Sequence, residues 1–383
     1  MRGLMAARMG LPGRVWTLLG GLLLGVTIGC SPVGTGEQPS SGQSSVPATA
    51  TATPEGTSIP VLNITQAWPR VKPRAVTVAG GVGFSEVGIA PDGTVALGEL
   101  VSGKGDPIGV ATVTRDTGKA TLIRKFSSPQ TQLISIAADN DWIVWSEGSN
   151  QPDFADWVIY SSNRHDQAIR KLAAASRPDG VHYPSTPYVM VSISQGVVVW
   201  SAIIGIDKRE RVFEIHADGT GFKILAKDAQ APQTVWPWVM FDTKPTGIDA
   251  DHLTITNLQT GRVAAVPGPS GVGYFAFDGE SVAWITQSYH DLSLMDISTE
   301  SITPIVRSSI NLQFVQLTHR LVSWGQADGS YVFDRKLKVI VKLGDIHNVY
   351  PFISEQALDW SQYQSPEAQN SAVWEQLETR DLP

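Results

Sequence analysis

The sequence has 383 residues, with 29 basic and 36 acidic side chains and a formal net charge of −7 at pH 7. An acidic balance without a cluster of Lys or Arg argues against a protein that binds nucleic acid or attaches to anionic lipid by charge. The single cysteine, Cys30, excludes an internal disulfide.

The first 29 residues have the organisation of an export signal. Arg2, Arg8 and Arg14 form a basic start, and residues 15–28 form an apolar run without charge. This run is shorter than the roughly 20 residues that a membrane-spanning helix needs. We therefore expect residues 1–29 to be a signal peptide.

The end of this stretch, Thr27-Ile28-Gly29-Cys30, resembles the lipobox of bacterial lipoproteins. The resemblance implies that Cys30 is lipidated and becomes the first residue of the mature chain, on the extracytoplasmic side of a bacterial membrane. Thr27 departs from the pattern, because the family usually has Leu or another aliphatic residue there. The alternative is that Cys30 is a buried or incidental thiol.

The segment that follows, residues 30–58, is rich in Ser, Thr, Pro and Gly and has no aromatic residue. Such a composition buries too little apolar surface to offset the entropy of ordering, so we expect a flexible tether. Because the signal holds three basic residues and no acid, the mature chain carries a net charge of about −10. Any membrane attachment must then be covalent.

Residues 59–383 consist of repeated units. A β-branched run that ends in tryptophan recurs at Trp145, Trp200, Trp284, Trp324 and Trp360, and Leu97 takes the same position in a degenerate copy. The interval of 84 residues before Trp284 splits into two units, and the hidden one would begin at TVWPWVMFD, around Trp238. This spacing predicts seven units, with six as the alternative.

Each unit also contains a hairpin of two alternating strands, as in RVFEIHADGTGFKILAKD after Trp200. Four short antiparallel strands per unit are typical of an all-β fold, the β-propeller of four-stranded blades. The last unit has room for only three strands, so we expect residues 75–80 (AVTVAG) to complete its sheet and close the ring.

The unit FEIHADGTGFKIL resembles the TolB-like and WD40-like propeller repeats, and His216–Thr220 match the motif most closely. The resemblance covers the chain from about residue 75. It implies a propeller fold and a role in binding, and it names no ligand.

The repeated tryptophans suit either a carbohydrate-stacking platform or packing between blades, and we expect packing. Two residues further along, on the same face of the strand, the units place long polar side chains. These are Glu99, Glu147, Gln326 and Gln362, while Ala202 and Thr286 break the series. They either line a polar mouth that receives a ligand or cap backbone groups at strand ends.

The loops after these positions are chemically varied, and binding residues often lie on such loops. Tyr289 and His290, followed by Asp291, form the main candidate cluster. The seven histidines show no metal-ligand spacing, and no motif of a catalytic nucleophile or a nucleotide site is present. We therefore predict no catalytic residue, metal or cofactor. The Asp-Gly pairs are turn residues or, alternatively, parts of calcium loops.

These features favour an exported, lipid-anchored, non-catalytic β-propeller that is monomeric and binds a protein or an envelope polymer. One alternative is a propeller enzyme that acts on extracellular polysaccharide or glycoside, with Glu99, Glu147 and the region of His290 near its mouth. Another is a purely structural component of an envelope complex.

Overall fold

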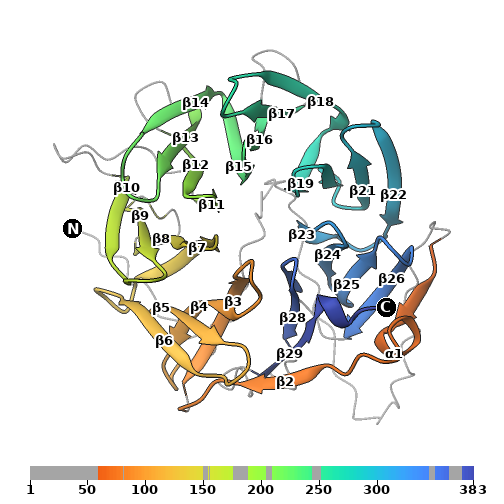
Figure 1. The fold of residues 1–383 in the computed structure, drawn as a ribbon, viewed down its shortest axis with the longest axis horizontal. Helices are drawn as coiled ribbons and strands as arrows, with labels where there is room; N and C mark the ends of the chain where they lie inside the picture. The colour runs from red at the N-terminus through yellow and green to blue at the C-terminus, as the bar shows by residue number, and fades with distance from the viewer. Residues whose placement is uncertain are drawn as a thin grey trace, which may run out of the picture. The chain divides into compact units, whose positions relative to one another are not determined.

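The computed structural model describes residues 59–80, 82–149, 154, 156–175, 189–203, 209–243, 252–344, 350–361 and 373–383. This part of the chain forms a seven-bladed β-propeller, and the predicted fold class is confirmed (Figure 1). The expected signal peptide, Cys30, the tether and Gln362 lie outside the described residues.

Each blade has four antiparallel strands, and the first of them lies nearest the centre of the ring (Figure 1). Blade 1 contains β3 (Gly83–Ile89), β4 (Val95–Val101), β5 (Pro107–Thr114) and β6 (Ala120–Lys125). Blade 2 contains β7 (Gln132–Ala138), β8 (Trp142–Gly148), β9 (Val158–Asn163) and β10 (Ile169–Ala174). Blade 3 contains β11 (Val191–Ser194), β12 (Val197–Ile203), β13 (Glu210–His216) and β14 (Lys223–Lys227).

The second half of the ring repeats this order. Blade 4 contains β15 (Ala229–Val235), β16 (Trp238–Thr243), β17 (His252–Asn257) and β18 (Val263–Ser270). Blade 5 contains β19 (Val272–Phe277), β20 (Ser281–Thr286), β21 (Asp291–Asp296) and β22 (Ser301–Arg307). Blade 6 contains β23 (Gln313–Leu317), β24 (Leu321–Gln326), β25 (Gly329–Asp334) and β26 (Val339–Gly344). Blade 7 contains β27 (Phe352–Ile353), β28 (Ala357–Ser361), β29 (Val373–Glu378) and, from the N-terminal side, β2 (Arg74–Thr77).

The strand β2 closes the ring as the sequence predicts. It pairs antiparallel with β29, from Arg74 opposite Gln376 to Thr77 opposite Val373. The predicted range, 75–80, begins one residue late and ends three residues late. The last blade thus combines strands from both ends of the propeller, with β2 as its outer strand.

The hidden unit is blade 4, so seven is the correct number. Its first strand begins at Ala229, before the stretch in which the sequence suggested the start of the unit. Phe241 occupies the position that tryptophan has elsewhere and is buried.

The repeated tryptophans pack between blades, which confirms the core interpretation. Trp145, Trp200, Trp324 and Trp360 are all at most 1% exposed. Trp200 stacks on Phe213 with ring centroids 5.4 Å apart, and Trp324 stacks on Tyr331 at 5.7 Å. Because each ring fills the space between two sheets, it is not available to stack on a sugar.

The N-terminal segment adds an element that the sequence pattern did not predict. Strand β1 (Val61–Asn63) pairs in parallel with β26 as a fifth strand of blade 6, and helix α1 (Ile64–Ala67) follows with a capping box of Asn63 and Gln66. Trp68 is fully buried, and its Nε1 donates to Asp334 Oδ2 at 3.1 Å. The chain is therefore fixed to blade 6 before it reaches blade 7.

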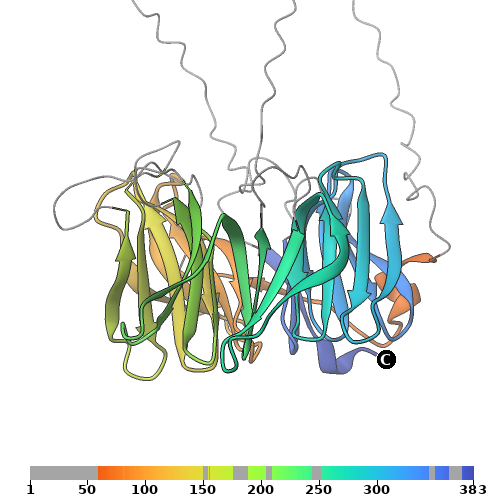
Figure 2. The same ribbon diagram turned by 90° about the horizontal axis from the view of Figure 1, so that it is seen from above.

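The strands run between two faces of the ring (Figure 2). One face carries the turns between the first and second and between the third and fourth strands of each blade, and we call it the turn face. The opposite face carries the loops between the second and third strands, and we call it the loop face. In the described ranges, no helix has the length and apolar composition needed to span a membrane.

Candidate functional site

Three of the residues predicted from the sequence lie at the loop face, where the second strands end. Gln326 is the last residue of β24, Glu147 lies one residue before the end of β8, and Glu99 lies two residues before the end of β4. All three side chains are buried. They belong to blades 1, 2 and 6. Glu99 and Glu147 lie at the same seam, between blades 1 and 2, because Glu99 bonds to Leu133, the cross-strand partner of Glu147. Gln326, in blade 6, is separate from them.

Glu99 acts as a link between blades. Its Oε2 accepts a hydrogen bond from the backbone N–H of Leu133, the second residue of β7, at 2.8 Å. Ser135 and Gln316 make the same kind of link, because they accept from the backbone N–H groups of Val191 and Ile353 in the following blades. Burial raises the pKa of Glu99 to about 7. The bond from Leu133 to Glu99 is a capping of a backbone group, which is one of the two roles that the sequence analysis considered for Glu99.

Glu147 and Gln326 also have partners within the protein. Glu147 accepts from Arg124 Nε at 3.1 Å and from Trp145 Nε1 at 3.0 Å. Gln326 Nε2 donates to Asp328 Oδ1 at 2.6 Å. A ligand that used Glu147 would have to displace its partners, whereas Gln326 Oε1 is buried without a partner among the described residues. The role of both residues in binding stays a prediction.

Tyr289 and His290 lie in the loop between β20 and β21, in blade 5. The Tyr289 ring lies against Tyr274, with centroids 5.8 Å apart. His290 Nδ1 is buried and has no hydrogen-bond partner among the described residues. These residues are thus apart from Glu99 and Glu147, and their role in binding also stays a prediction.

The described part of the ring has a groove on the turn face, at the seam where blade 7 meets blade 1. Its volume is about 690 Å³, within the range of roughly 300–1,000 Å³ that ligand pockets have. The lining is mostly polar and comes from the segment before β2, the turns of blade 1 and the end of β29: Arg70, Val71, Lys72, Arg74, Asp92, Gly93, Thr94, Arg115, Asp116, Gln356, Gln376, Leu377, Glu378, Arg380 and Asp381. The sequence placed its candidates on the opposite face.

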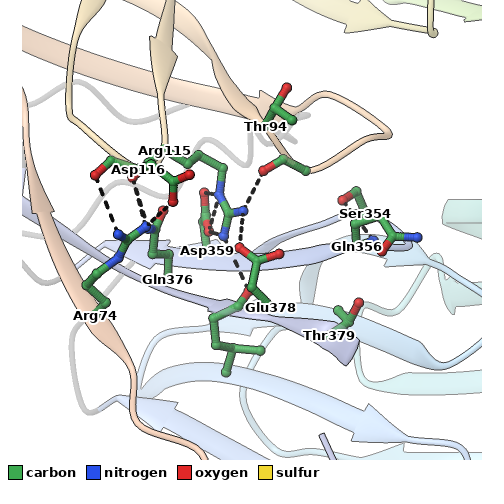
Figure 3. Close-up of polar contacts among 12 residues, drawn as sticks. Arg74, Thr94, Arg115, Asp116, Ser354, Gln356, Asp359, Gln376, Glu378 and Thr379 are labelled. Atoms are coloured by element: carbon green, nitrogen blue, oxygen red, sulfur yellow. Dashed lines mark hydrogen bonds and ion pairs between the residues drawn. The ribbon is translucent and has the colours of Figure 1, made fainter. Parts of the chain in front are cut away.

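Arg115 is one of the residues that line this groove, and Figure 3 shows its polar contacts. It follows the last residue of β5 and is 2% exposed. Its Nε and Nη2 donate to Asp359 at 2.9 and 2.7 Å, and its Nη1 donates to Glu378 at 3.0 Å and to the Gly93 carbonyl at 2.6 Å. Such a bidentate pair with further bonds holds the two blades in a fixed geometry.

Burial by itself would lower the pKa of Arg115, but the hydrogen bonds and charges of Asp359 and Glu378 raise it above its ordinary value. Burial raises the pKa of Asp359 to about 6, although Arg115 acts in the opposite direction. The cation is therefore fixed, and the titrating groups at the seam are the carboxyls.

Glu86, on β3, is the second buried carboxyl at the seam. Neither of its oxygens has a hydrogen-bond donor among the described residues. Burial, followed by the charge of Asp359, raises its pKa well above the ordinary value. Asp359 can only accept hydrogen bonds when ionised, so the two carboxyls satisfy each other when Glu86 carries a proton.

Close approach of the two blades shapes the wall of the groove at Gly93. Its φ is +68°, and a Cβ there would lie 2.9 Å from the Cβ of Gln356 in blade 7. Both the backbone conformation and the space thus require glycine. The first turn of blade 1 can then rest directly on the first turn of blade 7.

Arg115 belongs to a series of arginines that the sequence contains and that the predicted sites do not include. Arg164 and Arg335 also directly follow the third strand of their blades, β9 and β25. Each donates to a carbonyl in the first turn of its own blade, at Asp139 or Thr318, and to a carboxylate of the preceding blade, Asp92 or Asp278. An arginine just past the third strand was therefore the signal for a joint between blades.

Three cations at the rim of the groove differ from these buried arginines. Arg70, Lys72 and Arg380 are exposed, and none has an ion pair or hydrogen bond within the described ranges. Arg74 pairs with Asp116 at 2.8 Å (Figure 3). The basic residues are not clustered in the sequence. The fold brings the segment before β2 and the C-terminal turn together, so that their basic residues form a cluster at this rim.

No protein-family model and no curated protein matches this sequence. Solved structures match it in fold. An oligogalacturonate lyase from Vibrio parahaemolyticus is 10% identical with a TM-score of 0.53, and the match covers 80% of this chain and 97% of that chain. A prolyl endopeptidase structure is 10% identical with a TM-score of 0.54, over 78% of this chain and only 50% of that chain.

TolB from Acinetobacter baumannii is also among the similar structures, with 9% identity, a TM-score of 0.43 and coverage of 77% of this chain and 63% of that chain. The seven-bladed propeller predicted from the sequence is confirmed by the sheet topology. At these identities the likeness is one of fold alone.

Proposed function

We propose that this chain is an exported protein that a lipid on Cys30 anchors to a bacterial membrane, where its propeller acts as a non-catalytic binding module for a protein or an envelope polymer. The signal-like residues 1–29, the lipobox resemblance at Cys30 and the polar segment that follows support the address. The tether would hold the propeller away from the membrane surface.

The observation that carries the binding role is the groove at the seam of blades 7 and 1. Its walls are fixed by the buried bonds of Arg115, so the groove exists without a ligand and needs little ordering on binding. Its rim offers Arg70, Lys72 and Arg380 without partners in the described part of the chain. Exposed cations gathered at one rim attract a ligand of negative charge.

The test is capture of partners from envelope extract with three forms of the full chain. The first is the wild type, and the second carries Arg70→Glu, Lys72→Glu and Arg380→Glu. The third is a control with the same change of charge, Lys125→Glu, Lys171→Glu and Lys227→Glu. The control residues are exposed on the outer strands β6, β10 and β14.

We expect one component to bind to the wild type and the control and to be lost from the groove variant. The proposal is wrong if every retained component binds the groove variant as well as the wild type. A circular dichroism spectrum and a melting curve of each form show whether it is folded.

A second candidate function, an enzyme that acts on extracellular polysaccharide or glycoside, is favoured by the two buried carboxyls Glu86 and Asp359 near the groove. Carboxyls with strongly raised pKa values occur often at catalytic centres. Both are buried, however, and the residues that line the groove do not include them. A screen with the full chain should therefore find no turnover. Turnover that disappears in Glu86→Gln would replace the binding role by catalysis, as would turnover lost in Glu147→Gln.

A further inference from the structure

The segment before β2 presents its cations in a fixed arrangement. Trp68 and Val71 are buried, while Arg70 and Lys72 are exposed, so the segment alternates between core and solvent. It is attached to blade 6 through the bond from Trp68 to Asp334 and to blade 7 through β2. Two prolines, Pro69 and Pro73, restrict its backbone further.

Arg380 reaches the same rim from an equally well-held element, the 3₁₀ turn Thr379–Asp381. Thr379 and Leu382 are buried on either side of it. The last carbonyl oxygens of the chain, those of Leu382 and Pro383, accept hydrogen bonds from Arg320 at 3.3 and 2.7 Å. The backbone that carries the rim cations is thus held in place before any ligand arrives, which lowers the entropic cost of binding.

The charge of the groove is opposite to that of the protein. The propeller and tether carry about −10, whereas the groove lining has five basic and four acidic side chains. Asp116, Asp92 and Glu378 are each paired with an arginine. The side chains that remain available are three cations and Asp381, so the groove attracts negative charge.

The composition of the lining also distinguishes between anions. Guanidinium groups bind carboxylate through paired hydrogen bonds. The carboxylates in the lining repel a densely charged phosphate group more than a ligand whose charges are spaced along a chain. No described lining residue is aromatic, so a sugar ring finds no surface to stack on.

Thr94, Gln356 and Gln376 add neutral hydrogen-bonding groups along the walls. Gln376 is 2% exposed; its Nε2 donates to the Arg115 carbonyl at 2.9 Å, while its Oε1 has no partner in the part of the chain that the structure describes. Because this oxygen is buried, a ligand in the groove does not reach it, and the exposed neutral groups are those of Thr94 and Gln356. Neutral donors and acceptors between charges suit a polypeptide, which has amide groups between its side chains.

We propose that the groove binds an acidic segment of a partner protein, with carboxylate side chains on Arg70, Lys72 and Arg380 and the peptide backbone against Thr94 and Gln356. This inference rests on the proposed binding function and names the class of its ligand.

The experiment uses the full chain and a fluorescein-labelled peptide of ten glutamates, with fluorescence anisotropy as the readout. The wild type should bind this peptide and should not bind a peptide of ten glutamines. The groove variant Arg70→Glu, Lys72→Glu, Arg380→Glu should bind at least about tenfold more weakly, since it loses three charge contacts. The milder variant Arg70→Gln, Lys72→Gln, Arg380→Gln should bind with intermediate affinity. Increasing the NaCl concentration should weaken binding to the wild type.

The control Lys125→Glu, Lys171→Glu, Lys227→Glu should bind the acidic peptide as the wild type does. An equal loss in this control would show a general effect of charge and overturn the proposal. Tighter binding of oligogalacturonate or of inorganic phosphate than of the peptide, measured by competition, would overturn it too.

Failure of this inference can be separated from failure of the proposed function. If the acidic peptide does not bind but the groove variant still loses the captured partner, the groove is a binding site and its ligand is not an acidic peptide. If the groove variant keeps every captured partner, the groove has no role in binding.

Discussion

At the scale of single residues, the seam of blades 7 and 1 depends on one buried arginine. Arg115 satisfies Asp359, which is fully buried, and Glu378, which is partly exposed. The pair is not a source of stability in itself, because burying both charges costs about as much as their attraction gains. Its effect is to fix the geometry of two blades at the point where the chain closes on itself.

Replacing Arg115 by methionine should lower the free energy of unfolding by about 3–5 kcal/mol, because Asp359 is then left buried without its partner. Denaturant unfolding measures this change. Arg307→Met is the matched control, since Arg307 makes a similarly short pair with Asp291 but is 76% exposed. The control should unfold as the wild type does, and equal losses in both variants would contradict the role of Arg115.

Two buried carboxyls should make stability depend on pH. Folding raises the pKa of Glu99 from 4.5 to about 7 and that of Asp359 from 3.8 to about 6, so the folded state binds more protons than the unfolded state in between. Their contribution to the stability of the folded state is fully present at a pH below their pKa values in the unfolded chain. It is lost as the pH rises through their pKa values in the folded protein. The wild type should therefore be less stable at pH 8 than at pH 5 on account of these groups.

Glu99→Gln should remove most of the pH dependence of stability that Glu99 causes. Glutamine keeps an acceptor for the Leu133 N–H and has no charge to bury. The variant should gain stability over the wild type between pH 5 and pH 8, by at most on the order of 3 kcal/mol. Urea unfolding at pH 5, 6, 7 and 8 tests this. The exposed Asp106 supplies the control Asp106→Asn, and a difference from wild type that does not change with pH for Glu99→Gln would refute the assignment.

At the scale of elements, β2 decides whether the ring is closed. Val76 lies opposite Trp374 and is 6% exposed in a cluster with Phe84, whereas its neighbour Thr77 faces solvent. The strand thus has one face in the core and one face outside, as period-two alternation requires.

Val76→Asp should destabilise the propeller by about 3 kcal/mol or more, because it buries a carboxylate at the seam. Thr77→Asp places the same charge one residue away on the exposed face and should have a small effect. Melting curves followed by circular dichroism compare the two. Similar melting temperatures would mean that β2 does not close the ring.

The predicted elements also show which local signals are reliable. The tryptophan-bearing second strands were located correctly because an apolar, β-branched run has a strong pattern. The start of blade 4 was misplaced because β15 (AQAPQTV) contains proline and glutamine, and it pairs with β16 through an irregular register between Gln230 and Gln233. The parallel strand β1 was missed because three residues are too few to show any period.

At the scale of the whole molecule, the proposed lipid anchor on Cys30 can be tested directly. Metabolic labelling with a fatty acid should mark the wild type and leave Cys30→Ser unlabelled, because the label needs the thiol. The variant should also appear in the soluble fraction after cell lysis. Equal labelling of both forms would exclude a lipid on Cys30.

The positions of the candidate functional residues show what a local sequence pattern cannot predict. Glu99 and Glu147 were chosen as candidates since they recur at one position of the repeat, yet this position is at the seam of adjacent blades, where they bond to Leu133 and Arg124. A residue that recurs at the same position in several blades is suited to a contact that also recurs, such as the contact between adjacent blades. A binding site usually lies where the repeat is broken, as at the seam of blades 7 and 1.

The sequence by itself determined the class of fold, the number of blades, the packing of the tryptophans and the closing strand, because each follows from periodicity or from counting strands. Only the tertiary structure decided where charge gathers. Arg70 and Arg380 are 310 positions apart in the chain, and they line one groove because closing the ring brings its two ends together. Periodicity records which side of a strand a residue is on, whereas contacts between distant segments depend on the path of the whole chain.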